Sequence, residues 1–183
     1  GALVVCNVRY ILYGIKNGLL RCICRTSASR TLLRGHTDVL HDLSFFSFTS
    51  DVLASVGGNE VLVWRVFEEH LDAPDPETGS TKKIEYEKLL QLNLQATKMS
   101  WHPFDPNKFV LACGTSAVVV ETTGIETKKC PEGHATWDVQ SSGAGLSSLG
   151  VMLLHGSKVN DVRFTTKALH AVTAGADGRC KVW

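Results

Sequence analysis

Cysteine and histidine are the residues of this chain that could bind a transition metal. Cys22 and Cys24 lie on one face of a predicted strand, but no second close cysteine pair is present to complete a zinc site. Cys130 and His134 could supply two ligands, and a set of four is not visible around them. Free cysteine in an apolar strand also packs as a small hydrophobic residue. We therefore expect neither a metal nor another cofactor.

Motifs for phosphate binding and nucleophilic catalysis are incomplete. Gly156-Ser157-Lys158 lacks the upstream glycine that a nucleotide-phosphate loop requires. The small residues 141–145 do not form a Gly-x-Ser-x-Gly nucleophile elbow, and the sequence has no His-Glu-x-x-His motif. His, Asp and Ser are numerous, so counting alone leaves a catalytic triad open. Because no such constellation is visible, we expect a protein that is not an enzyme and assign no catalytic residue.

Aromatic and basic residues could contact a ligand directly. Trp101-His102-Pro103 could form an aromatic platform, although a core tryptophan followed by a turn explains the same residues. The pairs Lys82-Lys83 and Lys128-Lys129 could contact phosphates, but solvated loop charge explains them more simply. The net charge of +1 gives no broad field for a nucleic acid or an anionic membrane.

Histidine, aspartate and tryptophan recur at a fixed spacing. Trp64 follows His36 by 28 positions (64 − 36), and Trp183 follows His155 by the same 28 (183 − 155). Adding 119 to the numbers of the first copy superposes it on the second without a gap. The superposition pairs Asp42 with Asp161, Phe45 with Phe164 and Val63 with Val182.

This pattern resembles the WD-repeat blade of a β-propeller, which is a four-stranded antiparallel sheet. The resemblance implies that a His, a Ser or Thr, an Asp and the Trp of each blade form a hydrogen-bonded set that satisfies buried polar groups. In the last copy Gly175 occupies the Ser/Thr position, and in the first copy Gly58 occupies the Asp position. We expect a structural role for the blade residues His36, Asp42, Trp64, His155, Asp161, Asp177 and Trp183.

Apolar alternation and turn signals predict strands along most of the chain. The expected strands lie near 3–5, 10–15, 19–23, 30–34, 40–46, 51–56, 60–66, 99–101, 111–114, 117–120 and 151–154, and the last blade runs to Trp183. Asn17-Gly18 is a hairpin signal. A strand is also expected over 84–94, where Ile84, Tyr86, Leu90, Leu92 and Leu94 share one parity. A helix over 84–92 is the alternative, because Glu, Lys, Leu and Gln favour it.

These segments amount to roughly four blades, two of them incomplete. Ile23 and Glu121 occupy tryptophan positions in the other blades, and insertions lie near 68–83 and 122–147. Because propellers close with 4–8 blades, we expect residues 1–183 to be an all-β propeller segment of a longer protein. The 44% hydrophobic and 20% charged composition suits a globular core. No run reaches the roughly 18 apolar residues of a membrane helix, and the start is expected to be an internal strand rather than a signal peptide.

A narrower resemblance is carried by residues 8–18, 30–37, 42–46 and 53–56, and by the final segment with His155-Gly156 and Val159-x-Asp161-Val162. The Leu-Leu-Arg-Gly-His-Thr run at 32–37 is the most specific of these. Together with the paired insertions, they resemble the propeller of the Varicose family, the enhancer-of-mRNA-decapping scaffold proteins. The resemblance spans essentially the whole chain.

That resemblance implies a non-catalytic scaffold that assembles the decapping enzyme with its activators for 5′-cap removal in cytoplasmic processing bodies. It implies protein partners, indirect contact with mRNA, no membrane association, and oligomerisation through regions outside this chain. Two alternatives remain: a WD-repeat adaptor of another pathway, such as a ubiquitin-ligase substrate receptor or a trafficking scaffold, and a propeller enzyme. No partner-binding residue is assigned.

Overall fold

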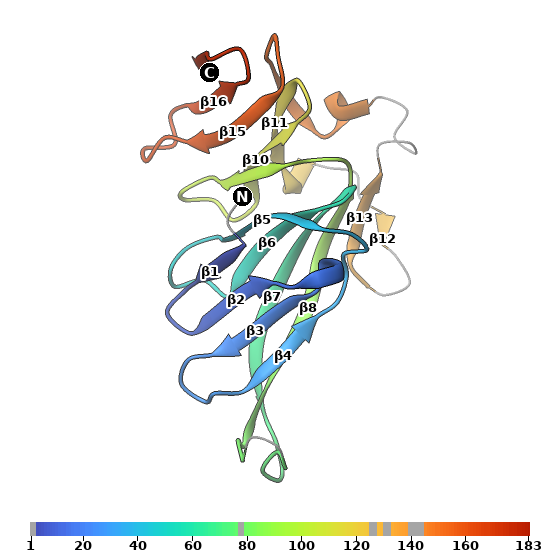
Figure 1. The fold of residues 1–183 in the computed structure, drawn as a ribbon, viewed down its shortest axis with the longest axis vertical. Coiled ribbons are helices and arrows are strands. Elements are labelled where there is room, and N and C mark those ends of the chain that lie inside the picture. The colour runs from blue at the N-terminus through green and yellow to red at the C-terminus, as the bar shows by residue number, and fades with distance from the viewer. Residues whose placement is uncertain (1–2, 77–78, 125–127, 130–132, 139–144) are drawn as a thin grey trace.

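The computed structural model describes residues 3–76, 79–124, 128–129, 133–138 and 145–183. Within these ranges the strands form four sheets, which follow one another in chain order from the blue to the red end of the ribbon (Figure 1). The helices in the same ranges are three short 3-10 turns: η1 (Lys16–Gly18), η2 (Thr122–Gly124) and η3 (Gly145–Ser148). None of these described helices is long and apolar enough to cross a membrane. The prediction of an all-β fold is confirmed.

Each sheet contains a set of antiparallel strands in chain order, and the insertion near 122–147 separates the last two strands of the third sheet. The first contains β1 (Val4–Cys6), β2 (Tyr10–Gly14), β3 (Leu20–Cys24) and β4 (Arg30–Leu33). The second contains β5 (Leu40–Phe45), β6 (Val52–Gly57), β7 (Glu60–His70) and β8 (Lys82–Asn93). The third contains β9 (Lys98–Trp101), β10 (Lys108–Cys113), β11 (Ser116–Glu121) and β14 (Gly150–Leu154). The fourth contains β15 (Val159–Phe164), β16 (Ala171–Gly175) and β17 (Cys180–Val182). Among the described residues, therefore, only the fourth sheet has fewer than four strands.

The order of the sheets is that of propeller blades. The first strand of each sheet packs beside the first strand of the next, in the series β1, β5, β9 and β15. The outer strand of one sheet leads directly into the first strand of the following sheet, so that His36 lies between β4 and β5, and His155 between β14 and β15. In the described residues the sheets do not close into a ring, and they form a partial propeller.

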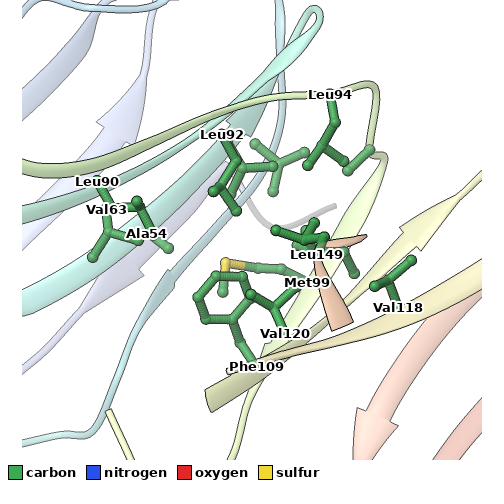
Figure 2. Packing of buried hydrophobic residues seen from close by; sticks show 14 of the residues in the cluster. Ala54, Val63, Leu90, Leu92, Leu94, Met99, Phe109, Val118, Val120 and Leu149 are labelled. Atoms are coloured by element: carbon green, nitrogen blue, oxygen red, sulfur yellow. The ribbon is translucent and has the colours of Figure 1, made fainter. Parts of the chain in front are cut away.

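The largest core cluster lies between the second and third sheets. Figure 2 shows Val63, Leu90 and Leu92 of the second sheet facing Met99 and Phe109 of the third. The second sheet is covered on its other face by the first sheet, where Leu53, Leu62 and Trp64 are buried. Because both faces of the sheet are covered, successive residues of β6 are buried on opposite faces. The strand therefore lacks the alternation of buried and exposed residues that a half-exposed strand shows.

A bulge in β8 changes the face to which its apolar residues point. Val63 pairs with Leu90, but the next residue, Trp64, pairs with Lys88, which leaves one extra residue in β8. As a result Ile84 packs toward the first sheet, whereas Leu90 packs toward the third. The shared parity of these residues correctly predicted a strand rather than a helix, but it does not place them on one face.

Both insertions contain strand residues. β7 continues to His70 and β8 begins at Lys82, so these two long strands project as a hairpin, and the connection between them spans 71–81 (Figure 1). The segment near 122–147 contributes β12 (Lys128–Lys129) and β13 (Ala135–Asp138). β13 pairs in parallel with residues 90–93 of β8, and it thereby extends the second sheet beyond its outer edge.

Candidate functional site

A buried hydrogen-bonded set joins the histidine and tryptophan of the first copy. Ser55 Oγ accepts a hydrogen bond from Trp64 Nε1 at 2.8 Å and lies 2.6 Å from His36 Nε2. All three residues are buried. Because they come from β6, β7 and the connection before β5, the set fastens the hairpin of one sheet to the chain arriving from the previous sheet. It also satisfies polar atoms that water cannot reach.

A carboxylate lies on the other side of the His36 ring. Gly58 is in the turn where an aspartate would be expected, but Glu60 Oε1 lies 3.8 Å from His36 Nδ1. The same oxygen accepts a hydrogen bond from the amide of Thr37 at 3.2 Å. Burial is the largest influence on the imidazole and lowers the pKa of His36 to about 4, so the ring is neutral at pH 7. Glu60 therefore faces an uncharged ring rather than a cation.

The last copy contains a different set from the one expected. Trp183 Nε1 donates a hydrogen bond to Thr173 Oγ1 at 3.0 Å, so Thr173 rather than Gly175 is the Ser/Thr member. His155 is buried, and its Nδ1 lies 3.7 Å from Asp177 Oδ2. A Cβ atom at Gly175 would collide with the His155 ring, so glycine is required there for a steric reason.

Two compensating length changes explain why the repeat did not reveal Thr173, because the ungapped superposition places Ala174 opposite Ser55. In the last copy the connection between the first and second strands is one residue shorter, and the following hairpin is one residue longer. An ungapped superposition therefore aligns the two tryptophans but shifts the middle strand by one position. The strand pairs that mark these lengths are Phe45–Leu53 and Val56–Val61 in the first copy, and Phe164–Ala171 and Ala174–Cys180 in the last.

The third sheet replaces the polar set with apolar residues. Val120 pairs with Phe109 in the register that Trp64 adopts in the second sheet, so Val120 rather than Glu121 occupies the tryptophan position. Leu111 occupies the position of the serine, and both Leu111 and Val120 are fully buried. Apolar packing therefore stabilises the β10–β11 hairpin, whereas side-chain hydrogen bonds stabilise the corresponding hairpin of the second sheet.

The two aspartates aligned by the repeat have different surroundings. Asp42 is buried in β5, and its Oδ2 accepts a hydrogen bond from the amide of Met99 at 3.1 Å. Asp161 in β15 has a side chain that is 46% exposed, and within the described residues it accepts a hydrogen bond from the adjacent amide of Val162 and lies 3.9 Å from Arg163 Nη2. Asp42 thus links two sheets, whereas the fourth sheet has no described neighbour for Asp161 to bind.

The candidate metal ligands are not assembled. No group of three or more His, Cys, Asp or Glu side chains in the described ranges could hold a metal ion. Cys130 lies outside the described residues, and His134 Nε2 lies 3.3 Å from Gln91 Oε1. Cys22 is buried, and its burial raises the pKa of the thiol to about 12, so the thiolate that a metal needs is strongly disfavoured.

The other chemical candidates also have structural partners. Trp101 is buried, and its Nε1 donates to the carbonyl of Ser44 at 3.1 Å, as a core residue would. Ser157 Oγ accepts a hydrogen bond from the amide of Asp177 at 3.1 Å within the last blade. Lys83 pairs with Glu85 on β8, and Lys128 and Lys129 form β12. Residues 141–144 lie outside the described part of the chain.

A pocket of about 670 Å³ opens beside the first polar set. Its polar lining consists chiefly of the carboxylates Asp38, Glu60 and Asp138 and the carboxamides Asn59, Asn93 and Gln95. Asp38 precedes β5, Glu60 begins β7 and Asp138 ends β13, so distant segments supply the three carboxylates. No motif spacing connects these segments, which is why the sequence did not predict the pocket.

Comparison with known families gives one match. The model of the WD40 repeat (WD domain, G-beta repeat) matches residues 146–183, which include β14 and all three strands of the fourth sheet. That range also contains His155, Asp177 and Trp183. No curated protein matches the chain. Residues 146–183 are therefore a WD40 repeat, within a fold that is a partial WD-repeat β-propeller.

Proposed function

We propose that this protein is a non-catalytic scaffold that assembles the mRNA-decapping enzyme with its activators. The WD40 repeat suggests a protein-interaction function. The observation that carries the scaffold proposal is the series of sheets whose first strands β1, β5, β9 and β15 pack side by side, with connecting loops between the strands. Sheets packed in this way form a frame that presents loop tips and pockets in fixed positions, which suits the capture of peptide segments.

The absence of a catalytic role is supported by the bonds of the polar residues themselves. His36, Ser55 and Trp64 contact one another in the interior, and Trp183 is bonded to Thr173. A histidine whose pKa is lowered to about 4 by burial is a poor base near neutral pH and has no direct access to a substrate.

The decapping assignment is supported by the sequence resemblance to the Varicose scaffolds. Its most specific run, at 32–37, contains Gly35 and His36, and it leads from β4 toward β5, beside the first polar set and the acidic pocket. The proposed partners are the decapping enzyme and its activators, and contact with mRNA is indirect. The proposed location is the cytoplasmic processing body, and oligomerisation depends on regions outside this chain.

A reconstituted decapping reaction tests the proposal. The purified protein is incubated with capped RNA alone, with the decapping enzyme and an activator, and with the same mixture after heat inactivation of the enzyme. We expect no cap release by the protein alone or with inactivated enzyme. When active enzyme and activator are both present, we expect the protein to make cap release faster than it is with the enzyme and activator alone. Cap release by the protein alone would contradict a non-catalytic role, and an unchanged rate in the complete mixture would contradict decapping activation.

A further inference from the structure

A second pocket, of about 510 Å³, lies where the fourth strands of the first two sheets meet. These strands, β4 and β8, contact each other (Figure 1). The lining includes Arg34, which directly follows β4, and Tyr86 and Lys88 of β8. Because Tyr86 and Lys88 are two positions apart and precede the bulge, they lie on the same face of the strand. We call this site the basic pocket.

The two cations of the basic pocket are not neutralised by the described residues. In that part of the chain neither Arg34 nor Lys88 forms an ion pair. Lys88 is partly buried, and its Nζ donates a hydrogen bond to the neutral amide oxygen Oε1 of Gln91 at 3.1 Å. Glu87 also lines the pocket, but its carboxylate is paired with Arg65 Nη1 at 2.7 Å. The described lining therefore has an excess of positive charge.

The hydroxyl group of Tyr86 adds a third donor to the basic pocket. Its oxygen accepts a hydrogen bond from the amide of Arg34 at 3.3 Å, and within the described residues its proton has no acceptor. The Tyr86 ring packs edge-on against Trp64, with 5.8 Å between the ring centroids. These two contacts hold the hydroxyl group in position in advance, as a binding site requires.

The ammonium group of Lys88 is also held in position. Gln91 Oε1, which accepts its hydrogen bond, lies 3.3 Å from Nε2 of the buried His134. Only one of the three N–H groups of Lys88 is used in this bond, so the others remain available to a ligand. The lining thus presents a guanidinium, an ammonium and a hydroxyl donor from separate positions, and the group that they suit is an anion rich in acceptors.

We propose that the basic pocket binds the phosphate group of a phosphorylated serine or threonine side chain in a partner protein. Such a group has three terminal oxygens and a charge of about −1.5 to −2 at pH 7. Arg34 can donate to it through two parallel N–H groups, while Lys88 and Tyr86 donate to the remaining acceptors. The inference rests on the proposed function in one respect, namely that the protein binds peptide segments of its partners.

A phosphorylated side chain fits the basic pocket better than a carboxylate or an RNA backbone does. A carboxylate and a phosphodiester each offer two charged oxygens and a single negative charge, which matches the three donors less well. RNA is also bound by extended basic surfaces. The chain has a net charge of only +1, and the two cations lie together in one pocket.

Ligand-observed saturation-transfer NMR tests the basic pocket directly. The probe is the capped pentapeptide acetyl-Gly-Ala-phosphoserine-Ala-Gly-amide, and its controls carry serine or glutamate in place of phosphoserine. A short oligouridylate RNA is the third control. We expect the phosphoserine peptide to bind about tenfold more tightly than each control, because only its phosphate uses all three donors. Equal binding of the phosphoserine and serine peptides, or tighter binding of the RNA, would overturn the proposal.

Two variants assign the binding to this pocket. R34Q/K88Q removes both cations and should weaken binding of the phosphoserine peptide by about tenfold or more. Tyr86→Phe keeps the ring against Trp64 and removes the donor, so we expect binding to weaken by about threefold. Circular dichroism establishes that the variants are folded. Unchanged binding by folded R34Q/K88Q would overturn the proposal.

The matched control is R179Q/K167Q, which removes one exposed arginine and one exposed lysine beside the strands of the fourth sheet. It changes the net charge by the same amount as R34Q/K88Q does. Binding of the phosphoserine peptide should stay within about twofold of that of the unmodified protein, because screening leaves distant surface charges with little influence. An equal loss of binding in both double variants would contradict a local site.

The outcome is separable from that of the decapping proposal. Phosphate-dependent binding at this pocket without decapping factors among the partners would leave the pocket assigned and remove the decapping assignment. Stimulation of decapping with no discrimination between the phosphoserine and serine peptides would remove the pocket and leave the scaffold function in place.

Discussion

Asp42 and Met99 join two neighbouring sheets through a hydrogen bond of 3.1 Å from the amide of Met99 to the Asp42 carboxylate. The bond connects β5 to β9, which are the first strands of the second and third sheets. The residue that the repeat aligns with Asp42 is Asp161, which has no such contact in the described structure. The two aspartates, Asp42 and Asp161, therefore provide a matched test of how neighbouring sheets are joined.

We expect Asp42→Ala to lower the free energy of unfolding by about 1–3 kcal/mol, because it leaves a buried amide without its partner. Asp161→Ala, which removes a largely solvated carboxylate, should change the free energy of unfolding by no more than about 0.5 kcal/mol. Urea unfolding of both variants measures the difference. Equal stability of Asp42→Ala and the unmodified protein would contradict the role assigned to this bond.

The second prediction concerns Ser55, which serves both His36 and Trp64. Ser55→Ala leaves two buried nitrogen atoms unpaired, and we expect the free energy of unfolding to fall by about 2–4 kcal/mol. The control is Ser44→Ala in the adjacent strand, because Ser44 Oγ donates its hydrogen bond to the neighbouring carbonyl of Phe45 and not to a buried side chain. If the two serine variants unfold at the same urea concentration, Ser55 does not hold the set together.

A third prediction tests the register of the last blade. Thr173→Val keeps the shape of the side chain and removes the acceptor of the Trp183 bond, so we expect a loss of about 0.5–1.5 kcal/mol. Gly175→Thr places a threonine at the position that the sequence pattern assigned to the Ser/Thr member. It should destabilise the protein more than Thr173→Val does, because the new side chain collides with His155. Stabilisation by Gly175→Thr would show that position 175, and not Thr173, holds the Ser/Thr member of this blade.

The pH dependence of stability follows from His36. The pKa of its ring is about 4 in the folded protein against an ordinary value of 6.5, so the unfolded chain binds the proton first as pH falls. Its contribution to stability is complete above pH 6.5 and declines toward pH 4, by about 3 kcal/mol over that window. His36→Gln should flatten the decline, whereas the exposed control His170→Gln should not. Chemical unfolding between pH 4 and 7 provides the measurement, and identical profiles for His36→Gln and the unmodified protein would contradict it.

Local signals in the sequence predicted the strands and turns well. Asn17-Gly18 indicated a tight turn, and both residues have the positive φ values that such a hairpin needs. What the sequence did not show depends on pairings between strands. Thr173 was missed because two one-residue length changes cancel along the chain, and the reversal of faces in β8 depends on a bulge at Leu89.

The candidate site was harder to predict than the fold. The histidine and tryptophan of the repeat indicated the buried set around Ser55, because they recur at a fixed spacing. The acidic pocket combines Glu60 with Asp138 of β13, a strand that pairs in parallel with β8 across a long stretch of chain. No local pattern encodes such a pairing, so only the folded chain brings these carboxylates together.

Affinity capture from cytoplasmic extract tests the central claim most directly. The full-length protein is used as bait, with and without RNase treatment, and the bound proteins are identified by mass spectrometry. We expect the decapping enzyme and its activators to be recovered, and to remain bound after RNase treatment because the contacts are between proteins. Recovery of only ubiquitin-ligase or vesicle-coat subunits would contradict the decapping assignment, as would loss of every decapping factor after RNase treatment.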